Sequence, residues 1–220
     1  SALAAAGALD FDAALLLVRE RGRVMKQAGT TRPGAMAAII GMDDAALAEV
    51  CRLASERSGG LGVVCANYNS PGQVVISGEA AALDAAIALA KERGARRAIP
   101  LAVSIASHSP RLQAAAQEFS AAVAQVALRP PRIPVVANVT ALPLLSIQEI
   151  RDEMVTQLTS PVRWTATIQY MIGQGVTSFV EVGPKDVLTG LTKRIDATAA
   201  TSSVGDAAGV ARFAGGGSNV

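Results

Sequence analysis

Residues 63–77 read VVCANYNSPGQVVIS, which predicts two short strands joined by a tight turn. The turn is Asn69-Ser70-Pro71-Gly72, in which proline fixes one backbone angle and glycine accepts a conformation that other residues avoid. The strands are expected at Val63–Asn67 and Gln73–Ser77, because both segments are rich in β-branched residues. This hairpin is the centre from which the rest of the fold can be assigned.

The flanking sequence adds a strand and a helix on each side of the hairpin. Before it, a strand at Ala35–Ile40 precedes a helix that Asp43 caps and that ends near Arg57, before the break at Gly59-Gly60. After it, a helix from Glu79 to Gly94 precedes a strand at Arg97–Leu101. The order strand–helix–strand–strand–helix–strand is that of a ferredoxin-like unit. We therefore expect residues 31–103 to form an inserted, ferredoxin-like small domain.

The remaining sequence alternates helices with strands, which favours a parallel α/β layer. Residues 1–30 and 104–200 are expected to form this larger domain, and residues 201–220 a partly disordered tail, with Gly215–Val220 disordered. The predicted elements are a helix at 10–26, a linker at 29–34, a loop at 104–110, a helix at 111–126, a strand at Ile133–Val139, helices at 146–158 and 161–173, a strand at 177–182 and a helix from Asp186.

Composition excludes several classes of protein. The chain has 220 residues, half of them hydrophobic, which allows one domain that carries a smaller inserted one. A net charge of +2 without a basic block argues against nucleic-acid binding. The sequence contains no apolar run of about eighteen residues, so no membrane span is predicted. Cys51 and Cys65 lack metal-ligand spacing and are expected to be buried free thiols of a cytoplasmic protein.

His108, the only histidine, follows a predicted strand and is a candidate general base; from the spacing alone, a structural or surface imidazole is the simpler interpretation. Arg21 has apolar neighbours at every helical spacing, so it should bind a carboxylate, either of a ligand or of a structural Asp or Glu. Gln157 lies beside an apolar helix row, and surface exposure is the simpler interpretation. Asn69 and Gln73 are at a tight turn, so a structural role is the first interpretation and a binding role the second.

Several segments, taken in order, resemble the bacterial malonyl-CoA:acyl-carrier-protein transacylases of the fatty-acid type, from Ser1 to about Ile195. They are AGALDF (6–11), VRERG (18–22), AMAAIIG (35–41), NSPGQVVISG (69–78), Ser107-His108, Gln157 with SPVRW (160–164), and EVGP (181–184) leading into VLTGL (187–191). Each segment alone is weak evidence, whereas the ordered set is strong.

The resemblance implies an α/β-hydrolase-like large domain, incomplete here, with the ferredoxin-like small domain inserted. It also implies a ping-pong reaction in which a serine takes malonyl from coenzyme A and passes it to the phosphopantetheine thiol of acyl carrier protein. His108 would deprotonate that serine while the backbone carbonyl of Gln157 orients its ring. Arg21 would bind the malonyl carboxylate, and Met25, Asn69, Gln73 and Ser107 would line the pocket. No cofactor and no metal are implied, and the full-length protein is expected to be a monomer.

The family's Gly-His-Ser-x-Gly-Glu motif, which would stand just before the segment that matches Ser1, does not occur in this sequence. We therefore expect the chain to have been cut from a longer one, and to be inactive and to fold poorly alone. Because Ser107 is small, this position does not decide whether the acyl group is malonyl or methylmalonyl. The alternatives are a polyketide synthase or malonate decarboxylase acyltransferase, and a non-catalytic remnant that binds an acidic carrier through Arg96, Arg97, Lys193 and Arg194.

Overall fold

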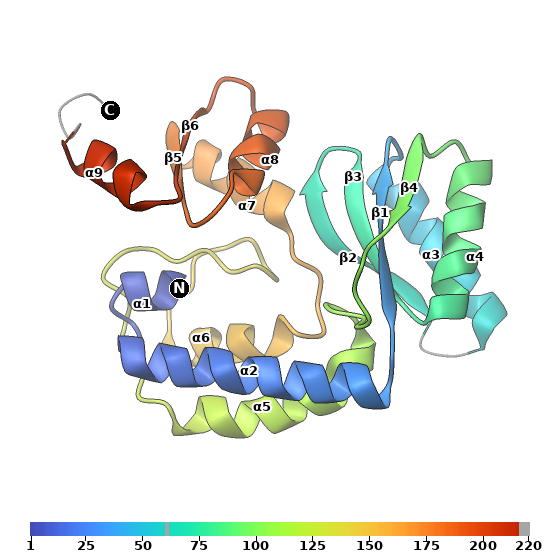
Figure 1. Cartoon of the computed structure of the whole chain (residues 1–220), viewed down its shortest axis with the longest axis horizontal. Helices are drawn as coiled ribbons and strands as arrows, with labels where there is room; N and C mark the ends of the chain where they lie inside the picture. The colour runs from blue at the N-terminus through green and yellow to red at the C-terminus, as the bar shows by residue number, and fades with distance from the viewer. Residues whose placement is uncertain (60–61, 216–220) are drawn as a thin grey trace. The chain divides into compact units, whose positions relative to one another are not determined.

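A computed structural model describes residues 1–59 and 62–215 of the chain. It divides into two compact units, Ser1–Trp164 and Thr165–Val220. The first unit contains a four-stranded antiparallel sheet and a group of helices, and the second contains a parallel pair of strands with its own helices (Figure 1). The chain thus has the mixed α/β architecture expected from its sequence.

The sheet of the first unit has the strand order β2-β3-β1-β4. Its elements follow one another as β1 (Ala35–Ile40), α3 (Asp44–Ser58), β2 (Val63–Ser70), β3 (Gln73–Gly78), α4 (Ala80–Glu92) and β4 (Arg97–Pro100). This confirms the predicted order of strands and helices. All three strand pairs are antiparallel, with Ile39 opposite Val74 and Ser70 opposite Gln73 at the turn.

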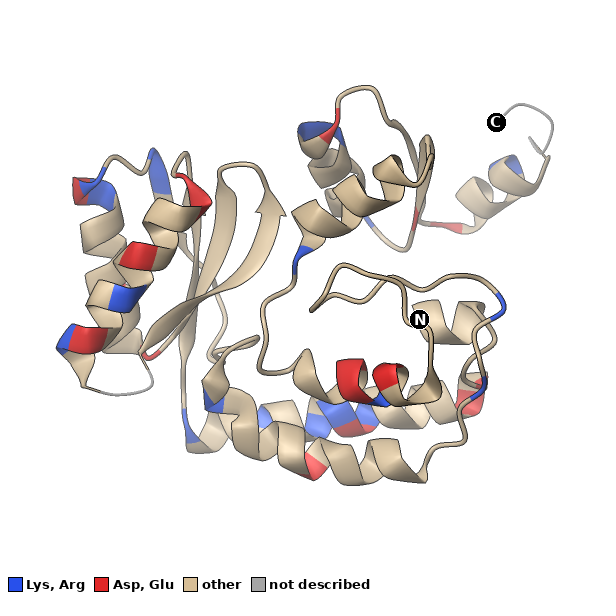
Figure 2. Ribbon diagram, turned by 180° about the vertical axis from the view of Figure 1, so that it is seen from behind, with Lys and Arg blue, Asp and Glu red and all other residues tan. Residues whose placement is uncertain are grey.

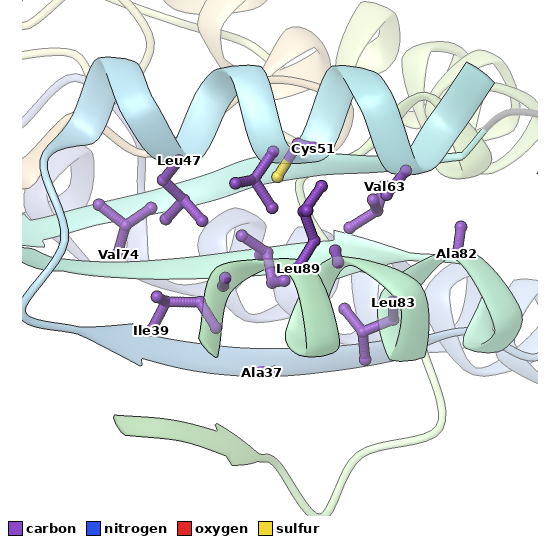
Figure 3. Close-up of a cluster of buried hydrophobic side chains, with 14 of the residues drawn as sticks. Ala37, Ile39, Leu47, Cys51, Val63, Val74, Ala82, Leu83 and Leu89 are labelled. Atoms are coloured by element: carbon purple, nitrogen blue, oxygen red, sulfur yellow. The ribbon is translucent and has the colours of Figure 1, made fainter. Parts of the chain in front are cut away.

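Helices α3 and α4 cover one face of this sheet. Asp43 begins α3 as predicted, because its side chain accepts from the backbone N–H of Ala45 and Ala46. The helix ends at Gly59 in a left-handed conformation, whereas Gly60 of the predicted break lies outside the described residues. Figure 3 shows the buried side chains gathered between the helices and the sheet, among them Leu47, Leu83 and Ile39. Two free thiols lie here, with the Sγ atoms of Cys51 and Cys65 4.0 Å apart.

The chain enters and leaves the sheet at neighbouring points. The backbone N–H of Gly34, just before β1, donates to the carbonyl of Ser104 at 3.2 Å. The N–H of Leu101, just after β4, donates to the carbonyl of Met36 at 2.9 Å. The sheet and its two helices are therefore formed by one continuous segment whose two ends are hydrogen-bonded side by side.

Gly78 marks a close approach of two strands and should not tolerate a side chain. A Cβ atom there would lie 2.2 Å from the carbonyl oxygen of Gly62 and 2.6 Å from the Cα of Val63. We expect Gly78→Ala to lower the free energy of unfolding by about 1–3 kcal/mol, measured by urea denaturation. Gly22→Ala is the control, because nothing lies within 4 Å of its added Cβ in helix α2. That variant should be neutral or slightly stabilising; equal losses in both would contradict the packing argument.

The helical part of the first unit comprises α1 (Ala2–Ala5), α2 (Phe11–Thr31), a short 3₁₀ turn η1 (Pro110–Leu112), α5 (Gln113–Gln125) and α6 (Ile147–Thr156). Helix α2 lies along α5, and their contact buries Leu17, Val24 and Phe119 (Figure 1). Helix α6 begins with a capping box formed by Ser146 and Glu149. These helices form the scaffold that positions the candidate site.

Several predicted elements are wrong in extent or kind. The strand expected at Val63–Asn67 continues to Ser70, so the turn before β3 is confined to Pro71 and Gly72. Helix α2 continues through Thr31, so the predicted linker 29–34 begins later. Ile133–Val139 is not a strand: among the described residues, Val136 makes only an isolated bridge with Pro143, which has no N–H for a ladder. The helix expected from Pro161 begins at Trp164, because Val162 is engaged by Ala66 and Tyr68 of β2.

The second unit contains most of α7 (Trp164–Gly173), β5 (Ser178–Val182), α8 (Val187–Ile195), β6 (Ala200–Val204) and α9 (Ala207–Gly215). Strands β5 and β6 pair in parallel, from Ser178 with Ala200 to Val182 with Val204. Strand β6 and helix α9 form where the sequence predicts a partly disordered tail, and residues 216–220 lie outside the described residues. No helix in the described part of the chain is long and apolar enough to cross a membrane.

Candidate active site

The candidate site combines side chains from three separate segments of the first unit. Arg21 comes from the middle of α2, His108 from the loop between β4 and η1, and Gln157 from the end of α6. Leu17 and Val24 face α5 and are buried, and Arg21 lies between them at helical spacing, so the same packing turns Arg21 inward. Residues that are far apart in sequence are thereby brought within hydrogen-bond distance.

His108 is held in a specific orientation by the backbone. Its own φ is 56°, a left-handed conformation, and the hydroxyl of the neighbouring Ser109 donates to the carbonyl of Ala106 at 2.7 Å. The ring Nδ1 lies 2.7 Å from the carbonyl oxygen of Gln157. Because a carbonyl only accepts, the proton is on Nδ1 and the lone pair of the neutral ring is on Nε2. Nε2 can therefore accept a proton from a nucleophile.

The surroundings of His108 keep its ring neutral. Burial lowers the pKa of His108, and the positive charge of Arg21 lowers it further, while hydrogen bonds to the backbone of Gln157 and Ser160 oppose both effects. A pKa below the usual value leaves the imidazole unprotonated at neutral pH. This is the state that a general base needs before the reaction begins.

Arg21 carries a positive charge that no carboxylate of the described residues pairs with. Its Nη2 donates to the side-chain oxygen of Gln157 at 3.0 Å. Burial lowers the pKa of Arg21, yet a guanidinium remains charged at every physiological pH. Every ion pair found among the described residues joins other side chains, such as Arg23 with Glu20 and Glu118. A half-buried cation with a neutral partner is suited to bind a carboxylate.

Arg21 and Gln157 line a cavity of about 260 Å³ within the first unit. Its walls are mostly apolar, with Leu17, Val18 and Met154 among them, and Glu153 is an additional polar group. The Glu153 carboxylate accepts from the backbone N–H of Asn138 at 2.7 Å, and burial raises its pKa. The cavity is therefore an apolar space in which Arg21 supplies the positive charge.

The other predicted site residues take different places. Met25 lies one turn beyond Arg21 and packs at the edge of the core between α2 and α5, and Ser107 is half-buried beside His108. Asn69 and Gln73 lie at the turn of the β2–β3 hairpin, also half-buried. The two hydrogen bonds that join Arg21, His108 and Gln157 include none of these four residues.

Sequence reasoning missed two residues next to the site, Ser160 and Glu153. Ser160 acts through its backbone, which gives no signal in the sequence. Glu153 stands four residues before Gln157 on α6, so its helical spacing from Gln157 was the one available indication. Within residues 1–59 and 62–215, no three His, Cys, Asp or Glu side chains are grouped so that they could hold a metal ion.

Comparison with known proteins decides the family. The model of the acyl transferase domain family matches residues 1–212. The chain therefore belongs to the acyl transferase family. Within this family it is 45% identical over 211 residues to the malonyl CoA-acyl carrier protein transacylase of Escherichia coli strain K12, which covers 96% of this chain and 67% of the relative. The Haemophilus influenzae transacylase is 47% identical over 94% of this chain and 66% of its own length.

Solved structures of acyl transferases have the same fold. The malonyl-CoA:acyl carrier protein transacylase from Xanthomonas oryzae superposes with a TM-score of 0.91 at 44% identity, over 96% of this chain and 67% of that one. A malonyl-transacylase in complex with a type II PKS acyl-carrier protein superposes with a TM-score of 0.88 at 40% identity, again over 96% and 67%. The chain thus spans about two thirds of the length of these acyl transferases.

Proposed function

We propose that this acyltransferase moves malonyl from coenzyme A to the phosphopantetheine thiol of acyl carrier protein, for fatty acid synthesis. The observation that carries the proposal is the pair of hydrogen bonds at Gln157, which bring together a neutral imidazole and a guanidinium whose hydrogen-bond partner is an uncharged amide. Sequence identity of 45% to a curated malonyl transacylase supports the same reaction. The chain is an enzyme by family, and its proposed partners are malonyl-CoA and the carrier protein.

The proposed mechanism is ping-pong with a covalent serine ester. The serine oxygen attacks the malonyl thioester carbonyl while Nε2 of His108 takes the hydroxyl proton. His108 then gives this proton to the leaving sulfur, so that coenzyme A departs as its thiol. The carrier's phosphopantetheine thiol then attacks the serine ester, and the serine regains its proton. The resemblance assigns this serine to the Gly-His-Ser-x-Gly-Glu motif, which the present sequence does not contain.

The finer assignments are part of the same proposal. Residues 31–103 form a ferredoxin-like small domain, as its β2-β3-β1-β4 order favours, and residues 1–30 with 104–200 belong to an α/β-hydrolase-like large domain. Met25, Asn69, Gln73 and Ser107 line the acyl or pantetheine pocket. The reaction as proposed needs no cofactor or metal, and the full-length protein acts as a cytoplasmic monomer.

A polyketide carrier is the second candidate acceptor, because one similar structure is a complex with a type II PKS acyl-carrier protein.

The non-catalytic alternative relies on basic residues that would bind an acidic carrier, but Figure 2 shows acidic and basic residues interspersed along the helices. Two of those proposed for carrier binding, Arg96 and Arg97, are exposed at β4.

The experiment is acyl transfer by the natural full-length protein. Malonyl-CoA is supplied with a fatty-acid carrier or a polyketide carrier, each bearing phosphopantetheine, and malonyl-carrier is measured by intact-protein mass spectrometry. We expect rapid labelling of the fatty-acid carrier. Preferential labelling of the polyketide carrier would support the second candidate, and labelling of neither, with binding retained, would favour the non-catalytic alternative.

A further inference from the structure

Gln157 contacts the two functional side chains through different atoms. Its backbone carbonyl accepts from His108, and its side-chain Oε1 accepts from Arg21. The amide nitrogen Nε2 donates to the carbonyl of Met154 at 3.3 Å, which fixes the amide with its oxygen toward the guanidinium. The backbone is fixed as well, because the N–H of Gln157 donates to Glu153 and the next residue, Leu158, is fully buried.

The neutrality of this side chain determines what Arg21 can bind. A carboxylate at the same place would neutralise the guanidinium and compete with any anionic ligand. An apolar side chain would leave the guanidinium without a fixed acceptor, free to rotate away from the cavity. An amide oxygen supplies orientation without cancelling charge, because it accepts one N–H and leaves the other donors free.

We propose that the side chain of Gln157 is a positioning residue for acyl specificity: it holds Arg21 toward the cavity so that a substrate carboxylate is bound there. This inference rests on the proposed function. It assigns to the side chain a role separate from that of the backbone carbonyl, which orients His108. Its action is indirect, through Arg21, and it requires no contact with the substrate.

Substitution separates the two roles, because every residue retains the backbone carbonyl. In the full-length protein, we expect Gln157→Met to lower the ratio of kcat/KM for malonyl-CoA over acetyl-CoA by about 10- to 100-fold, the range for one hydrogen bond to a charged group. The loss should appear mainly as a raised KM for malonyl-CoA. The pH midpoint of kcat, which reports His108, should not move. Gln157→Glu should lose more malonyl transfer than Gln157→Met, because the new carboxylate pairs with Arg21.

The matched control is Gln148→Met on the same helix, where the exposed side chain donates to Asp152 at 2.8 Å and has no other hydrogen bond within the described part of the chain. It should leave the malonyl-to-acetyl ratio unchanged. The proposal is overturned if Gln157→Met leaves that ratio unchanged, or if both acyl groups lose rate equally while the pH midpoint shifts, since that result indicates disturbance of His108.

A binding measurement separates failure of this inference from failure of the proposed function. Malonate and acetate are titrated calorimetrically into the unsubstituted protein and into Gln157→Met. Weaker malonate binding in the variant, with acetate unchanged, supports the inference even if no acyl transfer to a carrier occurs. Equal malonate affinity in the two proteins overturns it.

Discussion

Replacement of His108 by asparagine is expected to lower the kcat/KM of malonyl transfer by about 10²–10⁴-fold, the contribution typical of a general base. Asparagine suits this position because it tolerates the left-handed backbone, here with φ of 56°, better than most residues do. The variant therefore removes the titrating ring with little backbone strain. The measurement is initial-rate kinetics of carrier acylation by the full-length protein.

The pH profile gives the control for this prediction. Because burial lowers the pKa of His108, the unsubstituted rate should fall in acid with a midpoint below about 6.5, and His108→Asn should lose that midpoint. The stability of the folded protein should also increase as the pH rises through this midpoint. In that pH range the folded protein binds fewer protons than the unfolded one, so the free energy of unfolding rises with pH, and the variant loses this slope. An unchanged profile would assign the base to another group.

Replacement of Arg21 by alanine is expected to reduce the preference for malonyl over acetyl by about 100-fold or more. The difference between the two acyl groups is one carboxylate, and Arg21 is the cation in the apolar cavity. An acetyl group leaves the guanidinium unpaired and partly desolvated, a mismatch that sites with buried polar groups penalise strongly. The measurement is the ratio of kcat/KM values for malonyl-CoA and acetyl-CoA.

Arg23→Ala is the matched control for Arg21. Arg23 stands on the same helix, but its side chain is exposed and pairs with Glu20 and Glu118. Its removal should leave the ratio unchanged, since exposed pairs contribute little. If Arg21→Ala reduced malonyl and acetyl transfer equally, Arg21 would have a structural role and not a selective one.

The four-stranded part of the fold could be predicted from local chemistry alone. Each signal acts over a few residues: proline and glycine form the turn at Pro71-Gly72, Asp43 caps a helix, and β-branched runs favour strands. Those signals set both the order and the approximate bounds of the elements. Burial then follows, because the helix faces that carry Leu47 and Leu83 have nowhere else to pack than the sheet.

Elements that depend on distant partners could not be predicted in this way. Strand β6 has little apolar character, and what makes it a strand is its parallel pairing with β5. Ile133–Val139 shows the reverse: it is apolar enough to be a strand, but Val136 bridges only to Pro143 in the described structure. Pairing partners, which the local sequence does not specify, decided both cases.

The candidate site shows the same division. Arg21 could be suspected from its apolar helical neighbours, because a cation there requires a partner. Gln157 could not, since the atom that orients His108 is a backbone carbonyl that any residue would provide. The resemblance to a known family supplied that assignment. The side-chain bond to Arg21, by contrast, became visible only in the three-dimensional arrangement.

The bonded ends of the four-stranded segment bear on how such proteins diversify. Because Gly34 and Ser104 are joined by a backbone hydrogen bond, the whole segment between them leaves and rejoins the rest of the chain at one place. Genetic recombination could therefore exchange the segment between relatives as a cassette without rerouting the helices that hold Arg21 and Gln157. Since its β2–β3 hairpin carries Asn69 and Gln73, such exchange would replace these two residues while Arg21, His108 and Gln157 are inherited unchanged.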